Sequence, residues 1–331
     1  MGDFNSMNKA YQASKVIIDK RMEKERKEDL EHISQIADNE ILIVQGQYDR
    51  IEQVFDILQI KYGLLSPSQL RHVSLHPSQT LIINCPGDGI GDPELQKIKA
   101  FVAAGGFLFS TDWVLKNVLE QIFPEYVQYN RVESRDDVVK VEVVDKSSPY
   151  LKGLFEKNAE PMWWLETASY PIRIVNPEKV KILIQSQEMK ERYGEAPIVV
   201  TFNYGQGTVF HMVSHYYLQR ADLRSDRHKK SASAYAYEEM NLSQEEMKGT
   251  ESQLAGVSLG EVESAYSSAQ FMLNAMAERK KDQKAKNLQV PANLKVPKPE
   301  PPSTETDFSS SNLPVQAVQE KPAKSKKTPK K

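Results

Sequence analysis

The chain has 331 residues, a formal net charge of −2, 40% hydrophobic residues and a single cysteine. This length allows one large domain or two smaller ones, each with a filled core. The small net charge argues against a strong field for nucleic acid or an anionic membrane, and one cysteine excludes an intramolecular disulfide framework and a cysteine-rich metal centre. No apolar run reaches membrane-spanning length and no secretory signal is legible, so we expect a cytoplasmic protein with no membrane partner.

The first 39 residues form a charged segment with a thin apolar stripe at helical spacing, Leu30, Ile33 and Ile36. The segment 1–39 is therefore predicted to be a helical extension. It either lies on the following domain or meets a partner.

Residues 40–126 alternate between short apolar runs and stretches with apolar residues at helical spacing. EILIVQG, TLIINC and GFLFSTD have the β-branched or aromatic character of buried strands, and PELQKIKAFVAAGG reads as a helix with an early proline and a terminal glycine pair. A helix is also predicted from Arg50 to a stop at Gly63. This alternation predicts a parallel sheet with helices on both faces.

The pattern changes after residue 136. DDVVKVEVVD alternates with a period of two, and the NYGQG turn between two apolar runs predicts a hairpin, so the sheet is expected to end in a mixed or antiparallel section. In a strand through Trp163 and Trp164, one ring would face the core and the other the solvent or a partner. We take 40–218 as one α/β domain.

The C-terminal third divides into three predicted segments. Residues 219–257 are polar and are expected to be only partly ordered. Residues 258–282 form an amphipathic helix that begins with a capping-box pattern from Ser258 to Glu261. Residues 283–331 are rich in Pro, Ser and Lys and are expected to be a disordered basic tail, with at most a weak affinity for nucleic acid.

The stretch LIINCPGDGIGDPE, residues 81–94, raises the question of an active-site loop, because the only cysteine, Cys85, ends an apolar strand there. A thiol reacts only beside a base or a positive dipole, and a cysteine at the end of such a strand is typical of a small buried hydrophobic residue. The glycines of GDGIGD lack the spacing of a nucleotide fingerprint, and the acidic residues between them would repel phosphate.

Several motifs, taken in order, resemble the class I glutamine amidotransferase-like superfamily, closest to its trehalose-utilisation-type branch. They are Pro86-Gly87, Gly105-Gly106, the turn Tyr204-Gly205-Gln206-Gly207, a late histidine at His215, and SPYLKGL with Ser148 in place of a histidine. The resemblance covers about 180 residues, a full domain by length. It implies a three-layer α/β fold with a mostly parallel, flavodoxin-like sheet, a mixed late section and added terminal helices.

The resemblance also implies where a nucleophile would stand. Active members carry a cysteine on a sharp strand-to-helix elbow of the form Gly-x-Cys-x-Gly, which corresponds to residues 110–114 here. Asp112 falls near the nucleophile position, and Ser110 and Val114 replace the two glycines. No acidic residue follows His215 or His211 at the expected spacing, so neither histidine is expected to have the orienting acid of an active triad.

A metal site is not expected, because His211 and His215 would lie about 13 Å apart on one strand and no third ligand can be named. No cofactor is expected either. We predict a catalytically inactive domain that binds a protein partner or a small ligand at the carboxyl edge of the sheet. The ligand-facing residues would be Gly46, Gln47, Asp88, Gly89, Thr111, Asp112 and His215.

Two alternatives remain open at this stage. One is a hydrolase-type enzyme that uses Asp112 and His215 with a water molecule or a metal. The other is a scaffold subunit that acts through its terminal helices and tail.

Overall fold

A computed structural model describes residues 4–155, 160–216, 225–291 and 294. The described residues form one compact unit. The expectations for residues 219–224 and for the tail from residue 295 onward lie outside the described residues.

The centre of the fold is an eight-stranded sheet in the order β2-β1-β3-β4-β12-β11-β10-β7. Strands β2 to β12 in this order run parallel, whereas β11, β10 and β7 are joined by antiparallel pairing. The α/β class, the parallel section and the antiparallel late section are therefore as predicted. The bounds are β1 Ile41–Val44, β2 Gly63–Leu65, β3 Thr80–Ile83, β4 Phe107–Thr111, β7 Glu142–Val143, β10 Val180–Gln185, β11 Pro197–Tyr204 and β12 Gly207–Met212.

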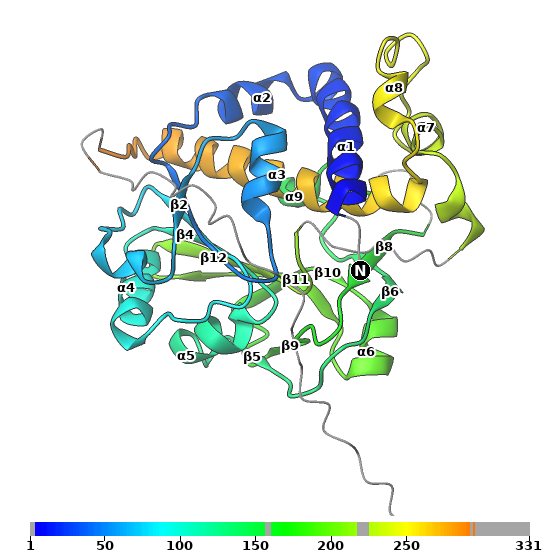
Figure 1. Cartoon of the computed structure of the whole chain (residues 1–331). Coiled ribbons are helices and arrows are strands. Elements are labelled where there is room, and N and C mark those ends of the chain that lie inside the picture. Colours follow the sequence, from blue (N-terminus) through cyan, green and yellow to red (C-terminus); the bar gives the residue numbers. More distant parts are fainter. Residues whose placement is uncertain (1–3, 156–159, 217–224, 292–293, 295–331) are drawn as a thin grey trace, which may run out of the picture. The chain divides into compact units, whose positions relative to one another are not determined.

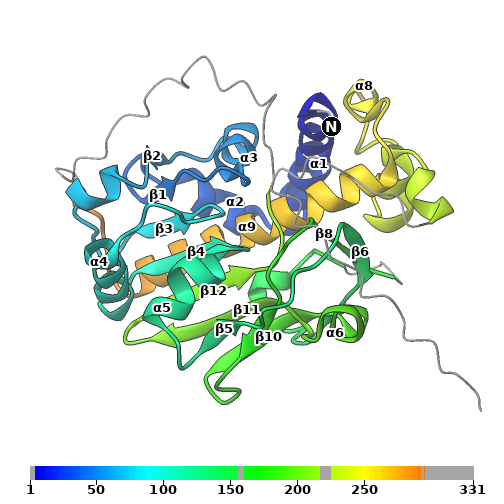
Figure 2. The same cartoon turned by 60° about the horizontal axis from the view of Figure 1, so that its bottom comes forward.

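Two small antiparallel sheets lie beside this one, β5 (Val127–Tyr129) with β9 (Ile172–Ile174) and β6 (Asp137–Lys140) with β8 (Met162–Leu165). Helices cover both faces of the main sheet (Figures 1 and 2). On one face lie α1 Phe4–Glu25, α2 Lys27–Ser34, α3 Ile51–Leu58 and α9 Leu259–Ala285, and on the other lie α4 Asp92–Ala103, α5 Glu120–Ile122 and α6 Gln187–Tyr193. Shorter turns of helix are η1 Gln69–His72, η2 Leu115–Leu119, η3 Pro149–Leu151, η4 Asp226–Lys229, α7 Ala232–Ala234, η5 Tyr235–Glu239 and α8 Glu251–Leu254.

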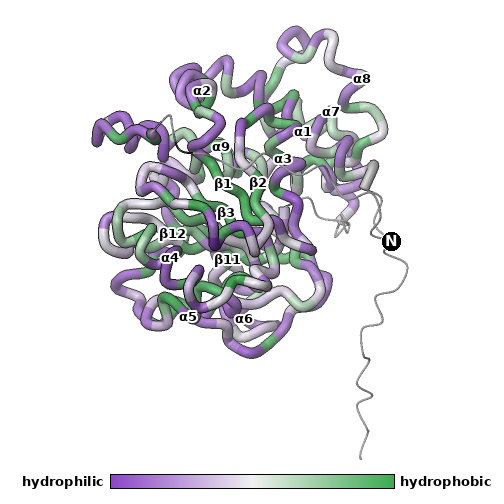
Figure 3. Tube along the Cα trace, turned by 60° about the vertical axis from the view of Figure 1, so that its left-hand side comes forward, coloured by the Kyte–Doolittle hydropathy of each residue, from purple (hydrophilic) through white to green (hydrophobic). Residues whose placement is uncertain are grey.

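The strands that form the middle of the sheet are apolar along their whole length. Both β1 and β3 are buried at every position, and Figure 3 shows them as hydrophobic segments inside a more polar outer layer. Such runs suit parallel strands that are covered on both faces. Helix α9 packs on the sheet through Phe271, which contacts Phe109 and Phe210.

The terminal helices belong to this core. Helix α9 begins with the predicted capping box, in which Ser258 and Glu261 bond each other's backbone N–H groups. Helix α1 packs along α9 and buries Ile17, Ile18 and Met22. The N-terminal helix therefore lies on the domain and contributes to its interior.

Two local expectations differ from the structure. Helix α3 ends at Leu58 with Gln59 in the left-handed conformation, and Gly63 instead begins strand β2. Trp163 and Trp164 are both buried, because β8 is covered on two sides. Trp163 donates to the carbonyl of Val213, and Trp164 packs beside His228.

Among the described residues, none of the helices combines the length and the apolar character needed to cross a membrane.

Candidate functional site

The carboxyl edge of the parallel strands gathers most of the chemistry-bearing residues. In the order β2-β1-β3-β4-β12, the chain adds β2 on one side of β1 and then β3 and β4 on the other side. Open α/β sheets bind ligands outside the carboxyl ends of the strands at such a switch point. The chain segments after β1, β3, β4 and β12 carry Asp49, Cys85, Asp112 and His215 respectively. Four residues far apart in the sequence thus come from adjacent strands.

Asp112 occupies the apex of the strand-to-helix elbow after β4. Its φ of 44° lies in the left-handed region, and its N–H donates to the carbonyl of Met212 at 2.9 Å. The side chain is completely buried. Ser169 Oγ donates to Oδ2 at 2.7 Å and the N–H of Tyr170 donates to Oδ1 at 2.7 Å, so both carboxylate oxygens accept a bond.

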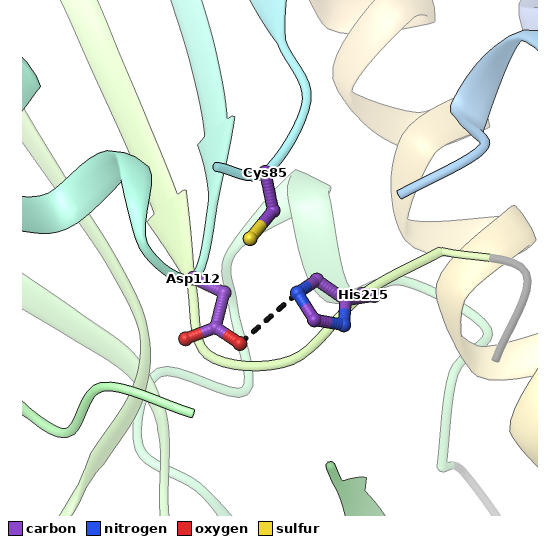
Figure 4. A group of neighbouring side chains, drawn as sticks. All are labelled: Cys85, Asp112 and His215. Carbon is purple, nitrogen blue, oxygen red and sulfur yellow. Dashed lines mark ion pairs between the residues drawn. The ribbon is translucent and has the colours of Figure 1, made fainter. Parts of the chain in front are cut away.

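His215 stands between two carboxylates. Its Nε2 lies 3.1 Å from Asp112 Oδ2, and its Nδ1 contacts the carboxylate of Glu166 (Figure 4 draws the Asp112 contact). Burial alone would lower the pKa of His215, but its interactions with Cys85 and Asp112 raise that pKa well above the ordinary range.

His215 lacks the local His-x-Glu pattern, as the sequence shows, but it does not lack an orienting acid. Glu166 supplies that acid from the segment after β8, 49 residues earlier in the chain. The sequence pattern searched for an acid two positions after the histidine, and no local signal marks Glu166. His211 lies apart from this group, completely buried on β12, with Nδ1 bonded to Ser110 Oγ at 3.0 Å.

Cys85 is a buried thiol beside His215 and Asp112. It shows no solvent exposure, and burial raises its pKa to about 11 against the opposite effect of His215. The bond from Cys85 to Pro86 is cis. Gly46 packs directly against the backbone of Cys85, because a Cβ on Gly46 would lie 2.0 Å from the carbonyl oxygen of Cys85. No larger residue fits there without moving a strand end.

A second acidic side chain, Asp49, lies under the same edge. Thr111 donates its hydroxyl to Asp49 Oδ2, and the N–H of Tyr216 donates to Oδ1 at 2.9 Å. Burial raises the pKa of Asp49 to about 7, although His215 and Thr111 act in the opposite direction. The sequence predicted Thr111 as a site residue, but Asp49, which holds it, was not singled out.

The predicted site residues thus divide into two groups. Gly46, Thr111, Asp112 and His215 surround or support the buried cluster. Gln47 and Asp88 are exposed, and Asp88 accepts a bond from Asn117 Nδ2 at 3.1 Å. Gly89 is also exposed, and its nearest neighbour in the direction of a side chain is Pro67. Of these three, only Gln47 contacts the cluster, through its backbone N–H, which donates to the carbonyl of Cys85 at 3.0 Å.

An aromatic cover, defined as Tyr48, Trp113, Tyr170 and Tyr129, lies beside the cluster. Trp113 meets Tyr48 edge-on at 5.2 Å and stacks on Tyr170 at 5.4 Å, and Tyr170 stacks on Tyr129 at 3.8 Å. Lys116 lies over the ring of Tyr170 and Arg131 over the ring of Tyr129. Tyr48 is 47% exposed and Trp113 is half-buried, so the cover reaches the surface.

No family model and no curated protein matches the chain. Solved structures similar to it include an exo-β-1,4-mannosidase from Opitutaceae bacterium strain TAV5, with 13% identity, a TM-score of 0.35, and coverage of 54% of this chain and 31% of that one. The matched region is thus less than a third of the mannosidase's length.

Two smaller proteins are also similar. One is a cytoplasmic protein of Salmonella typhimurium (13% identity, TM-score 0.37, 54% of this chain and 88% of that one). The other is a ThuA-like protein from Bacteroides uniformis (11% identity, TM-score 0.37, 54% of this chain and 82% of that one). We assign no family and no activity from likenesses of this size. The α/β architecture rests on the sheet itself.

Proposed function

We propose that the chain is a catalytically silent amidotransferase-like domain that binds a partner protein at the carboxyl edge of its sheet. The observation that carries the proposal is the burial of the elbow residue. Asp112 stands where the resemblance places a nucleophilic cysteine, and it has no exposed surface. A substrate could reach it only by displacing the residues that cover it.

The chemistry of the cluster also supports the absence of catalytic activity. A carboxylate in place of a thiol, with both oxygens bonded by Ser169 and Tyr170, is held in place and has lost its freedom to attack. The thiol of Cys85, with a pKa of about 11, is protonated near neutral pH, whereas nucleophilic attack by cysteine requires the thiolate.

The aromatic cover is the surface that we assign to the partner. Tryptophan, tyrosine and arginine dominate the energetics of protein interfaces, and here they stand together with Lys116. The exposed ring of Tyr48 offers apolar area, and Lys116 adds positive charge at the rim, where Arg131 is paired with Glu120. These features fit a partner segment with apolar and acidic side chains.

Site-specific photocrosslinking in extracts of the source cells tests this proposal. A crosslinking residue replaces Tyr48 in one version and Val144, exposed at the far side of the sheet, in the control version. We expect one protein to be crosslinked from position 48 and not from position 144, and the same product to disappear when Trp113→Ala is added. Equal crosslinking from both positions, or a product insensitive to Trp113→Ala, would contradict the assignment.

A hydrolase remains the second candidate, because Glu166 orients His215 in the way that a general base requires. Hydrolysis of glutamine, simple amides and esters, measured with the wild type and with His215→Gln, separates the two candidates. Turnover that is present in the wild type and lost in the variant would replace the silent-domain proposal. The same background rate for both proteins is the result expected here.

A further inference from the structure

Three side chains of metal-ligating type converge at the buried cluster. One ligand atom each of Cys85, Asp112 and His215 lies within 4.8 Å of the other two. In Figure 4 they come from three separate segments and point into the same space. Cys85 and Asp112 are completely buried, and His215 is 6% exposed.

The hydrogen bonding of His215 leaves one nitrogen directed into this space. Because Nδ1 contacts the carboxylate of Glu166, the proton of a neutral ring belongs on Nδ1. Nε2 then presents a lone pair toward Asp112 Oδ2, 3.1 Å away, and Nε2 is buried without a hydrogen-bond partner. In the metal-free protein a proton on Nε2 removes the repulsion between this nitrogen and the carboxylate oxygen, and a metal ion can take the place of that proton.

We propose that Cys85, Asp112 and His215 bind one zinc ion. Thiolate, imidazole and carboxylate are the three ligand types of zinc sites in proteins, whereas Mg²⁺ and Ca²⁺ favour oxygen ligands only. The sequence alone did not reveal this set, because its three members follow three different strands, β3, β4 and β12.

The surroundings of the three ligands are those of a supported metal site. Metal-bound histidines usually donate their second N–H to a carboxylate, and Glu166 occupies that position here. Asp112 is oriented by Ser169 and Tyr170, and the N–H of Trp113 faces the Cys85 sulfur. Each of the three ligands therefore has a hydrogen-bonding partner outside the metal site that fixes its orientation.

The geometry requires only a small adjustment. Ligand atoms around tetrahedral zinc lie about 3.3–3.8 Å apart. The ligand atoms of the cluster all lie within 4.8 Å of one another. Because the site is buried, its role is to join the ends of β3, β4 and β12, which goes beyond partner binding and does not depend on it.

Metal analysis of untagged full-length protein tests the inference. The protein is stripped with a chelator, dialysed against excess Zn²⁺ and then against buffer, and its zinc content is measured. We expect about one zinc ion per chain and a higher melting temperature than for the stripped protein, because an ion that binds only the folded state stabilises it. Zinc content near zero, with an unchanged melting temperature, overturns the proposal.

Cobalt replacement places the ion. Cys85 is the chain's only cysteine, so a thiolate-to-cobalt charge-transfer band in the Co²⁺-loaded protein reports this residue alone. The band should disappear in Cys85→Ser, and zinc content should fall in His215→Gln. The exposed His72→Gln should change neither. Zinc retained at full stoichiometry in both Cys85→Ser and His215→Gln would place the ion elsewhere and overturn the assignment.

Glu166→Gln distinguishes an outer positioning residue from a ligand. It should keep the cobalt–thiolate band while weakening zinc affinity about 10- to 100-fold, the usual effect of losing such a partner. An unchanged affinity would contradict the role given to Glu166. The wild-type band can be measured whatever the stability of the variants, so the test does not depend on their folding.

Discussion

Two of the regions in which the molecule buries charged side chains differ in how completely those side chains are paired. One is a helix-layer cluster where α1, α2 and α9 meet, formed by Arg26, Asp29, Asn274 and Lys281. The other is the site cluster of Cys85, Asp112, Glu166 and His215 at the carboxyl edge of the sheet.

In the helix-layer cluster the charges balance. Arg26 donates to Asp29 at 2.6 Å and to Asn274 Oδ1 at 2.6 Å, and Lys281 lies 2.6 Å from the other oxygen of Asp29. Lys281 also pairs with Glu278 at 2.7 Å. Two cations therefore meet two carboxylates, and Asn274 links the group to the main chain by donating to the carbonyls of Tyr150 and Lys152.

In the site cluster one histidine faces two carboxylates and a thiol, and its Nε2 has no hydrogen-bond partner. A group that only holds the fold together gains nothing from this excess of negative charge, because an incompletely paired buried group is destabilising. We infer from this difference that the helix-layer cluster has a structural role, whereas the site cluster is suited to bind an additional cation.

Gly46→Ala should have the largest effect on stability, because Gly46 packs against the backbone of Cys85 in the site cluster. The new Cβ would overlap the carbonyl of Cys85, so the ends of β1 and β3 must separate. We expect the free energy of unfolding to fall by about 3 kcal/mol or more, as in severe overpacking. Urea denaturation followed by circular dichroism measures this change.

Gly256→Ala is the matched control for this substitution. Gly256 has a φ of 76° and nothing within 4 Å of the added Cβ, so only the backbone preference is affected, by about 1 kcal/mol. Equal losses for the two variants would show that the close approach at Gly46 does not matter.

Asp29→Asn should have the next largest effect, because it breaks the balance of the helix-layer cluster. The buried Arg26 and the partly exposed Lys281 would lose their shared carboxylate. Breaking a buried pair in this way costs about 3 kcal/mol. The free energy of unfolding at neutral pH tests the value, and a loss under 1 kcal/mol would mean that the cluster is not a structural anchor.

The elements that depend on local sequence pattern could be predicted from the sequence. The apolar runs of β1, β3 and β4, the glycine-ended helix α4 and the hairpin between β11 and β12 were predicted from periodicity and turn residues. Helix α9 was identified from its capping box. The elbow at Asp112 and the late position of His215 came from the order of motifs.

The remainder depends on contacts between distant segments. Glu166 reaches His215 across 49 residues, and Cys85 meets Asp112 because β3 and β4 are neighbours in the sheet. Trp164 is buried because η4, from a segment with no clear pattern, places His228 against it. Strand periodicity predicts that neighbouring side chains face opposite ways, but it does not predict what will cover each face.

Asp49→Asn should alter the pH dependence of stability. In the folded state Asp49 has a pKa of about 7, above its unfolded value of about 3.8, so between these values the folded state binds the extra proton. Its contribution to stability is thus present at low pH and is lost as pH rises through 7, by up to about 1.4 kcal/mol per pH unit. The wild type should therefore lose stability relative to Asp49→Asn as pH rises from 4 to 7, because the variant carries no carboxyl proton to lose.

Metal-stripped protein is required for that measurement, because an ion at the site cluster would lie close to Asp49. A difference that stays constant across this pH range would mean that Asp49 is ionised in the fold. In that case the site cluster would hold still more negative charge than we infer.

Asp112→Asn should have the smallest effect on the stability of the metal-stripped protein, although it is chemically the same change as Asp29→Asn. Asparagine tolerates the left-handed backbone at this elbow, and the substitution removes one of two carboxylates that compete for a single histidine. We expect a change of about 1 kcal/mol or less in the free energy of unfolding. A loss equal to that of Asp29→Asn would show that Asp112 is as much a structural anchor as Asp29, and the contrast between the two clusters would then fail. A small loss in the stripped protein, together with reduced zinc binding, is the pattern expected of a residue kept for a ligand.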